Sequence, residues 1–171
     1  MPPALRKLTL TVHVSLSVGW LGAIAVFLAL AVLELAAPDE RTARATYLVM
    51  APTAWFVLVP LSLAALVTGL VQSLGTNWGL FRHYWIIFKL TINILAATVV
   101  VLYAGSVSHL ADMAAAPDES AADALWRTPS PLLHAVGGLL LVIGAVVLSV
   151  YKPRGVTPYG RRRERAIGRT S

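Results

Sequence analysis

The chain has 171 residues and a net charge of +6; 57% of its residues are hydrophobic, 13% are charged, and its mean hydropathy is +0.73. A water-soluble domain usually carries about 25% charged residues, so this composition excludes a soluble globule and predicts an integral membrane protein. The chain contains no cysteine, which excludes disulfides, iron–sulfur clusters and thiolate metal sites. Most of the positive charge sits in the C-terminal tail.

Four apolar runs are long enough to cross a bilayer, which takes about 20 apolar residues. They cover residues 8–36, 47–74, 84–108 and 132–151. Lipid offers the backbone no hydrogen-bond partners, so each run is predicted to be an α-helix, and Pro60 predicts a kink in the second. The first run is too long for a signal-peptide core and is expected to be retained. The predicted fold class is all-α: a four-helix transmembrane bundle forming one domain over 1–151, with a basic, flexible tail over 152–171.

The lysines and arginines of the loops predict the orientation of the bundle. If both termini are cytoplasmic, all but three of the 14 basic residues lie on the cytoplasmic side. The exceptions are Arg41, Arg44 and Arg127. The loop after the third run carries four acidic residues against one arginine, as is typical of an outer loop. We therefore expect a multi-pass protein of the cell (plasma) membrane with both termini in the cytoplasm.

The stretch "GTNWGLFRHYWIIFKL" (75–90) joins the second and third runs and is predicted to be a short cytoplasmic turn. Its tryptophans, phenylalanine and tyrosine match the aromatic belt of a membrane interface, and Arg82 follows the positive-inside pattern. Lys89 would lie about 8 Å into the third helix, a depth that a lysine stem covers by snorkelling. This interpretation accounts for every polar residue of the stretch except His83.

The four histidines fall into two pairs of matching depth. His13 and His83 are expected near the cytoplasmic face, and His109 and His134 near the outer face. Imidazoles that face each other across a helix bundle are usual axial ligands of b-type haem, so all four are candidate cofactor ligands, with His13 and His83 as the candidate iron ligands. Lys89 is a candidate partner of the haem propionates. Equally, these histidines can be packing or interfacial residues with no ligand.

A haem also needs a flat slot beside its ligand, and small residues supply one. Ser17 lies one turn after His13, and Gly138 lies one turn after His134. The third helix separates His83 from His109 by about 39 Å, too far for two haems that are both buried in hydrocarbon. At most one pair can therefore be deep, and His13 is the histidine that lies clearly within an apolar run.

Other polar groups narrow the function further. Asn93 is predicted to form a hydrogen bond between neighbouring helices, and Thr68 is predicted to form one to the backbone of its own helix. Glu34 is predicted to lie near the outer end of the first helix, where water can reach it. Because no acidic residue is expected at mid-membrane, a carboxylate-driven antiporter is not predicted, and motifs of hydrolases and ATPases are absent.

The basic tail contains prolines and glycines that are predicted to prevent a stable helix. Its arginines are expected to bind anionic lipid headgroups at about 1 kcal/mol per charge, and no nucleic-acid partner is predicted because the positive-inside pattern already accounts for them.

The stretch "HVSLSVGWLG" (13–22), together with "GTNWGLFRHYW" (75–85), resembles an uncharacterised family of small, actinobacterial-type integral membrane proteins, a domain of unknown function. An early histidine followed by Trp20 and Gly22 is more distantly similar to CopD-like copper-resistance proteins and to HemJ-like membrane protoporphyrinogen oxidases. That resemblance implies that His13 is a haem ligand and that Lys89 is a propionate or porphyrin partner.

Three functions remain open at this point. The first is a haem b protein that transfers electrons or handles porphyrins, which could be an enzyme. The second is a non-enzymatic scaffold or accessory subunit with a tightly packed bundle and no slot beside His13. The third is small-molecule transport, for which Asn93 and the Pro60 kink are the only indications.

The predicted orientation can be tested with reporter fusions. A reporter that is active only outside the cytoplasm should be silent when fused after Tyr151 and active when fused after Asp118, because basic residues flank the first site and acidic residues the second. Activities in the reverse order would contradict the orientation.

Overall fold

The computed structural model describes residues 1–75, 80–116, 128–153 and 155–167, with side chains as far as residue 162. Four helices in these ranges are long and apolar enough to cross a membrane, as predicted. The spans are α1 (Pro3–Leu35), a composite second span, α4 (Tyr84–Ala115) and α6 (Ser130–Tyr151). The composite span consists of α2 (Glu40–Thr53), the π-helical turn η1 (Ala54–Leu58) and α3 (Val59–Gly75). A short helix, α7 (Pro158–Ile167), follows α6.

Several helix boundaries differ from the hydropathy pattern, and two of these differences have a local explanation. The second span begins at Glu40 because the Asp39 side chain caps it, accepting a hydrogen bond from the Thr42 backbone N–H at 2.8 Å. The α4 helix continues to Ala115, past the expected end at residue 108, through a segment rich in alanine, leucine and methionine. These residues favour helix irrespective of their depth in a membrane.

The second span, for which the sequence predicted a kink at Pro60, contains a π-helical turn just before this proline. The η1 turn ends at Leu58, two residues before Pro60, and the Val59 N–H donates to the Ala54 carbonyl five residues back. Proline withholds one backbone donor, and a single wide turn is a common way for a helix to absorb such a break. This turn contacts both α1 and α4, the two helices that flank the composite span.

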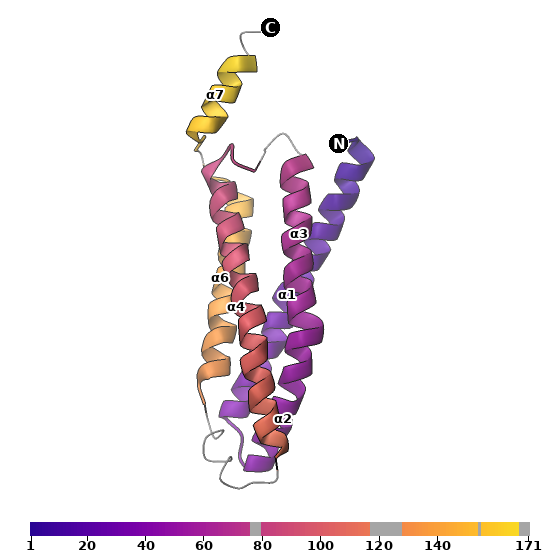
Figure 1. Ribbon diagram of the computed structural model, residues 1–171, viewed down its shortest axis with the longest axis vertical. Helices are drawn as coiled ribbons and strands as arrows, with labels where there is room; N and C mark the ends of the chain where they lie inside the picture. The colour runs from indigo at the N-terminus through magenta and orange to yellow at the C-terminus, as the bar shows by residue number, and fades with distance from the viewer. Residues whose placement is uncertain (76–79, 117–127, 154, 168–171) are drawn as a thin grey trace.

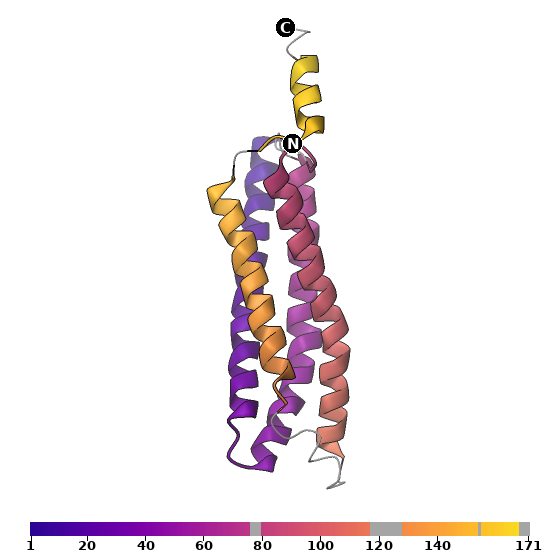
Figure 2. The ribbon, with the colours of Figure 1, turned by 90° about the vertical axis from the view of Figure 1, so that its left-hand side faces the viewer.

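The spans form a closed ring of antiparallel neighbours (Figures 1 and 2). Both α1 and α4 pack against the composite span and against α6. The N-terminus and α7 consequently lie at one end of the bundle, called here the terminal end, while the α1–α2 connection, the end of α4 and the start of α6 lie at the far end (Figure 1).

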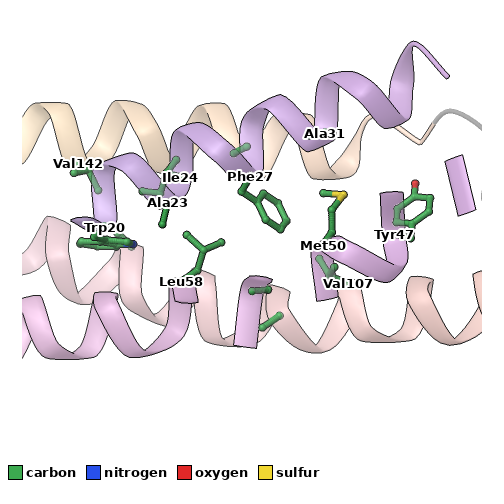
Figure 3. Packing of buried hydrophobic residues seen from close by; sticks show 14 of the residues in the cluster. Trp20, Ala23, Ile24, Phe27, Ala31, Tyr47, Met50, Leu58, Val107 and Val142 are labelled. Atoms are coloured by element: carbon green, nitrogen blue, oxygen red, sulfur yellow. The ribbon is translucent and has the colours of Figure 1, made fainter. Parts of the chain in front are cut away.

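The inner face of α1 is a stripe of buried residues that recur every three or four positions. The stripe consists of Trp20, Ala23, Ile24, Phe27, Ala31 and Glu34. Facing helices contribute mainly alanines together with Met50, Leu58, Val107 and Val142 (Figure 3). Small residues let the backbones approach closely, while large apolar side chains such as Phe56 and Leu102 face outward on every span, as suits a lipid environment.

At the terminal end, the stretch 80–84 is joined to the tail segment 155–157. Thr157 donates its backbone N–H to the Arg82 carbonyl oxygen at 2.9 Å and its hydroxyl to the Phe81 carbonyl oxygen at 2.6 Å. Lys152, with φ at 43°, ends α6 in the left-handed conformation and turns the chain toward this contact. We call residues 80–84 and 155–157 the terminal clasp.

The tail forms a helix where the sequence predicted none. Pro158 occupies the first turn of α7, where proline is tolerated because N–H groups at that position have no helical partner. The Thr157 hydroxyl accepts a hydrogen bond from the Gly160 N–H at 3.1 Å and so caps the helix. The prediction was wrong because it counted helix-breaking residues without regard to their positions.

Replacing Gly160 with alanine should open the terminal clasp. An added Cβ would lie 2.6 Å from the Arg82 carbonyl oxygen and 2.6 Å from a Val156 methyl group, which is too close for either contact. Alanine normally stabilises a helix by about 1 kcal/mol relative to glycine, so an opening of the clasp would be due to these contacts and not to helix propensity. We expect faster amide hydrogen exchange in 152–162, measured by mass spectrometry. Gly22→Ala is the control, because no atom lies within 4 Å of its added Cβ; equal exchange in both variants would contradict the clasp.

Candidate functional site

His13 is held by α3 through a hydrogen bond and a close packing contact. Its Nδ1 lies 3.0 Å from the Thr68 hydroxyl oxygen, and that hydroxyl lies 2.7 Å from the Ala64 carbonyl oxygen. Because the carbonyl can only accept, Thr68 donates to it and receives its own hydrogen bond from His13 Nδ1–H. A Cβ at Gly69 would lie 3.1 Å from His13 Cε1, so the glycine leaves just enough room for the ring. Between His13 and α3 there is therefore no slot for a macrocycle.

Two residues of α4 lie on the same side of the bundle. Lys89 is half-buried and within electrostatic range of the His13 ring. The Asn93 amide donates to the Lys89 carbonyl oxygen at 2.8 Å, within its own helix rather than across to a neighbour as the sequence predicted. His13, Thr68 and Lys89 thus form a small polar group contributed by three helices.

The other two predicted ligands on α4 are located at its two ends. His83 is the N-cap residue of α4, in an extended conformation, and its backbone pairs with Val156 in the terminal clasp. His109 is exposed on the surface of the helix. Among the described residues, no group of three or more histidine or acidic side chains is arranged to hold a metal ion.

A cavity of about 340 Å³ lies inside the bundle, next to His134 rather than His13. Its size is near the lower end of the roughly 300–1,000 Å³ range of small-molecule sites. The lining comes from α1, η1, α4 and α6 and is almost entirely apolar, with Trp20, Phe27 and Tyr103 as its aromatic members. Leu133 and His134 line it and are also exposed, so the cavity opens at the bundle surface beside the first turns of α6.

Glycines keep the cavity open on the α6 side. Gly137 and Gly138 line it, and a Cβ built at either position would meet no atom within 4 Å. The sequence analysis identified Gly138 beside His134, and the structure places an open space there.

His134 and Tyr103 form the polar edge of the cavity. Their rings are stacked, with centroids 3.7 Å apart and planes within 9° of parallel. His134 Nδ1 lies 2.8 Å from the Ser130 carbonyl oxygen, which can only accept, so Nδ1 carries the proton and a neutral ring keeps an acceptor at Nε2. The Tyr103 hydroxyl lies 3.1 Å from the Ser130 hydroxyl oxygen. This edge joins α4 to α6.

Trp20 provides a second polar group in the lining. The residue is 2% exposed, and its Nε1–H has no hydrogen-bond partner among the described residues. A buried donor without a partner is rare and calls for an explanation, such as a missing ligand. Sequence reasoning treated Trp20 only as part of a motif.

The cavity meets some requirements of haem b and not others. His134 has the backbone-bonded Nδ1 that is common among metal-ligating histidines. However, no second histidine lines the cavity, and no lysine or arginine among the described lining residues could pair with propionates. A haem b held by two histidines does not fit this lining, and the haem ligands named from the sequence stay predictions.

Glu34 lies beyond the cavity, at the far end of the α1 stripe. The sequence predicted that water would reach it, but the residue is 1% exposed. That prediction was wrong because Glu34 follows Phe27 and Ala31 at helical spacing and therefore faces inward with them. The helical periodicity of α1 indicates that Glu34 is buried, whereas its position near the end of the helix does not.

The His13–Thr68 bond should contribute measurably to stability. Thr68→Val keeps the shape of the side chain and removes the acceptor of His13 Nδ1, so we expect unfolding to become easier by about 1 kcal/mol, the scale of a single side-chain bond between membrane helices. The melting temperature in detergent measures the effect. Thr53→Val is the matched control, because the Thr53 hydroxyl bonds only to the Val49 carbonyl of its own helix. Equal shifts in the two variants would contradict a role for the bond between helices.

No protein-family model matches the chain, and no characterised protein or solved structure is significantly similar to it.

Proposed function

We propose that this membrane protein binds an uncharged, ring-containing, lipid-soluble molecule in the cavity beside His134. The observation that carries the proposal is the apolar cavity, which opens at the bundle surface and whose lining holds one unpartnered buried donor, Trp20 Nε1–H, and one available acceptor, His134 Nε2. Such a lining combines the apolar walls of a small-molecule site with a few placed polar groups.

The chemistry of the lining narrows the ligand class. Trp20, Phe27 and Tyr103 offer aromatic faces that favour stacking against a planar ring. The described lining carries no charged side chain, which disfavours an ionic ligand because a buried, unpaired charge is costly. A ring with an oxygen acceptor would satisfy the Trp20 donor. Quinones and related ring compounds of the bilayer meet these requirements.

The route into the cavity supports the same class. Its exposed lining residues, Leu133 and His134, lie in the first turns of α6 on the outer surface of the bundle. A molecule dissolved in the bilayer can therefore enter sideways, without passing through water. This geometry is compatible with a binding or carrier protein and requires no catalytic residue.

Filling the cavity should abolish binding of a quinone. Gly138→Leu places a side chain in the open space, whereas Gly144→Leu adds the same side chain to the same helix at a position equally free of neighbours and outside the lining. With a short-chain quinone as the probe and quenching of tryptophan fluorescence as the signal, we expect affinity to fall at least about tenfold, or about 1.4 kcal/mol, in Gly138→Leu only. Equal affinities in the two variants would refute the site.

Absorption spectra separate this proposal from haem binding. Protein produced with ample haem and examined before and after dithionite should show no Soret band. A Soret band that is present in the wild type and disappears in His134→Ala would show that the cavity binds haem and not a quinone-type ligand. A band that disappears in His13→Ala but persists in His134→Ala would place the cofactor at the His13 group instead.

A further inference from the structure

The carboxyl group of Glu34 is buried at the far end of the bundle and forms no ion pair with a described residue. The residue is 1% exposed and stands one position before the last residue of α1. Neither carboxyl oxygen has a hydrogen bond of good geometry to any described residue. A buried carboxyl group in this state needs either a bound proton or a bound cation, because an isolated negative charge in an apolar interior is very costly.

The titratable groups that face Glu34 are phenols. Tyr47 of α2 is fully buried, and Figure 3 shows its hydroxyl turned toward the last turns of α1; it is the side chain that interacts most directly with the Glu34 carboxyl. Tyr103 of α4 is within electrostatic range of Glu34. Behind Tyr103 stands His134 of α6, stacked on the phenol ring.

Arg44, one of the two arginines of α2, has its partners on α2 and α4. Arg44 pairs with Glu40 at 2.6 Å and donates to the carbonyl oxygens of Ala114 and Ala116 at 3.2 and 2.7 Å. These contacts direct its guanidinium toward the end of α4. Among the described residues, the groups that act on the Glu34 carboxyl are therefore neutral, and such surroundings favour the protonated acid over the carboxylate.

The position of Glu34 allows exchange with the solution. It is covered by side chains, yet it lies in the final turn of its helix, so a small local opening would expose it. On the inner side, Tyr103 bonds to Ser130 and lines the cavity. The polar groups therefore run from the far end of the bundle to the edge of the cavity.

We propose that Glu34 is a proton-binding site, whose carboxyl group takes up and releases a proton inside the bundle beside the Tyr47 hydroxyl. The proton binds one carboxyl oxygen, and its release leaves a carboxylate to which Tyr47 can donate. This site does not depend on the ligand proposed for the cavity, since the proton resides on residues of the chain itself.

Infrared difference spectroscopy of the protein in lipid nanodiscs tests the proposal directly. Between acidic and alkaline buffer, the wild type should show the carbonyl band of a protonated carboxylic acid, shifted in deuterated water. Glu34→Gln, a neutral isostere, should lose this band. The matched control Glu40→Gln, which removes the ion-paired carboxylate of α2, should retain it.

A second variant probes the pairing with tyrosine. Tyr47→Phe should keep the band but move its frequency, because the acid loses the polar hydroxyl group beside it; an unmoved band would overturn that pairing. Absence of the band in the wild type at every pH, or its persistence in Glu34→Gln, would overturn the proton site. A carboxylate signal that responds to sodium or potassium and not to pH would overturn it in favour of a cation site.

Discussion

Hydrocarbon offers no hydrogen-bond partner to a polar group, and every feature of this molecule follows from that constraint. The backbone satisfies it by forming four long helices. Side chains satisfy it by pairing between helices: His13 with Thr68, Trp55 of η1 with Ser108 of α4 at 2.8 Å on the bundle surface, and Tyr103 with Ser130. Polar groups inside the bundle that lack such a partner are therefore the places where function is to be sought.

Two residues stand out by this criterion. Among the described residues, the Trp20 N–H at the cavity has no acceptor, and the Glu34 carboxyl group, farther along the same buried stripe of α1, has no hydrogen bond of good geometry. The cavity explains the Trp20 donor, because an oxygen atom of a bound ligand can accept its hydrogen bond. Protonation accounts for the second. Tyr103 is close to both, so the two proposed sites share one neighbour while remaining chemically independent.

Glycine has opposite effects in the two halves of the bundle. At Gly69 the absence of a side chain lets the His13 ring pack directly against α3, and the ring fills the available space. At Gly137 and Gly138 the absence of a side chain leaves an open space beside His134. The two histidines accordingly differ in what they can do. His13 resembles a packing residue, as expected for a bundle without a slot beside it, whereas His134 retains a ring nitrogen at the edge of a cavity.

The sequence by itself determined the four spans, because about 20 apolar residues in lipid have no alternative to a helix. The helical spacing of Phe27, Ala31 and Glu34 also indicates that Glu34 faces inward, although its depth alone suggested exposure. The π-helical turn before Pro60 was not predicted, because the proline indicated only a kink. Capping at Asp39 and Thr157 escaped detection, since hydropathy does not register single hydrogen bonds.

Only the tertiary structure decided which polar groups meet. Thr68 is 55 positions from His13, and Ser130 is 27 positions from Tyr103, so no local pattern could pair them. The same holds for the cavity: whether a glycine receives a neighbouring ring or leaves a void depends on the helix that faces it. A stripe of small residues predicts close packing in general, and the register between two helices decides where that packing fails.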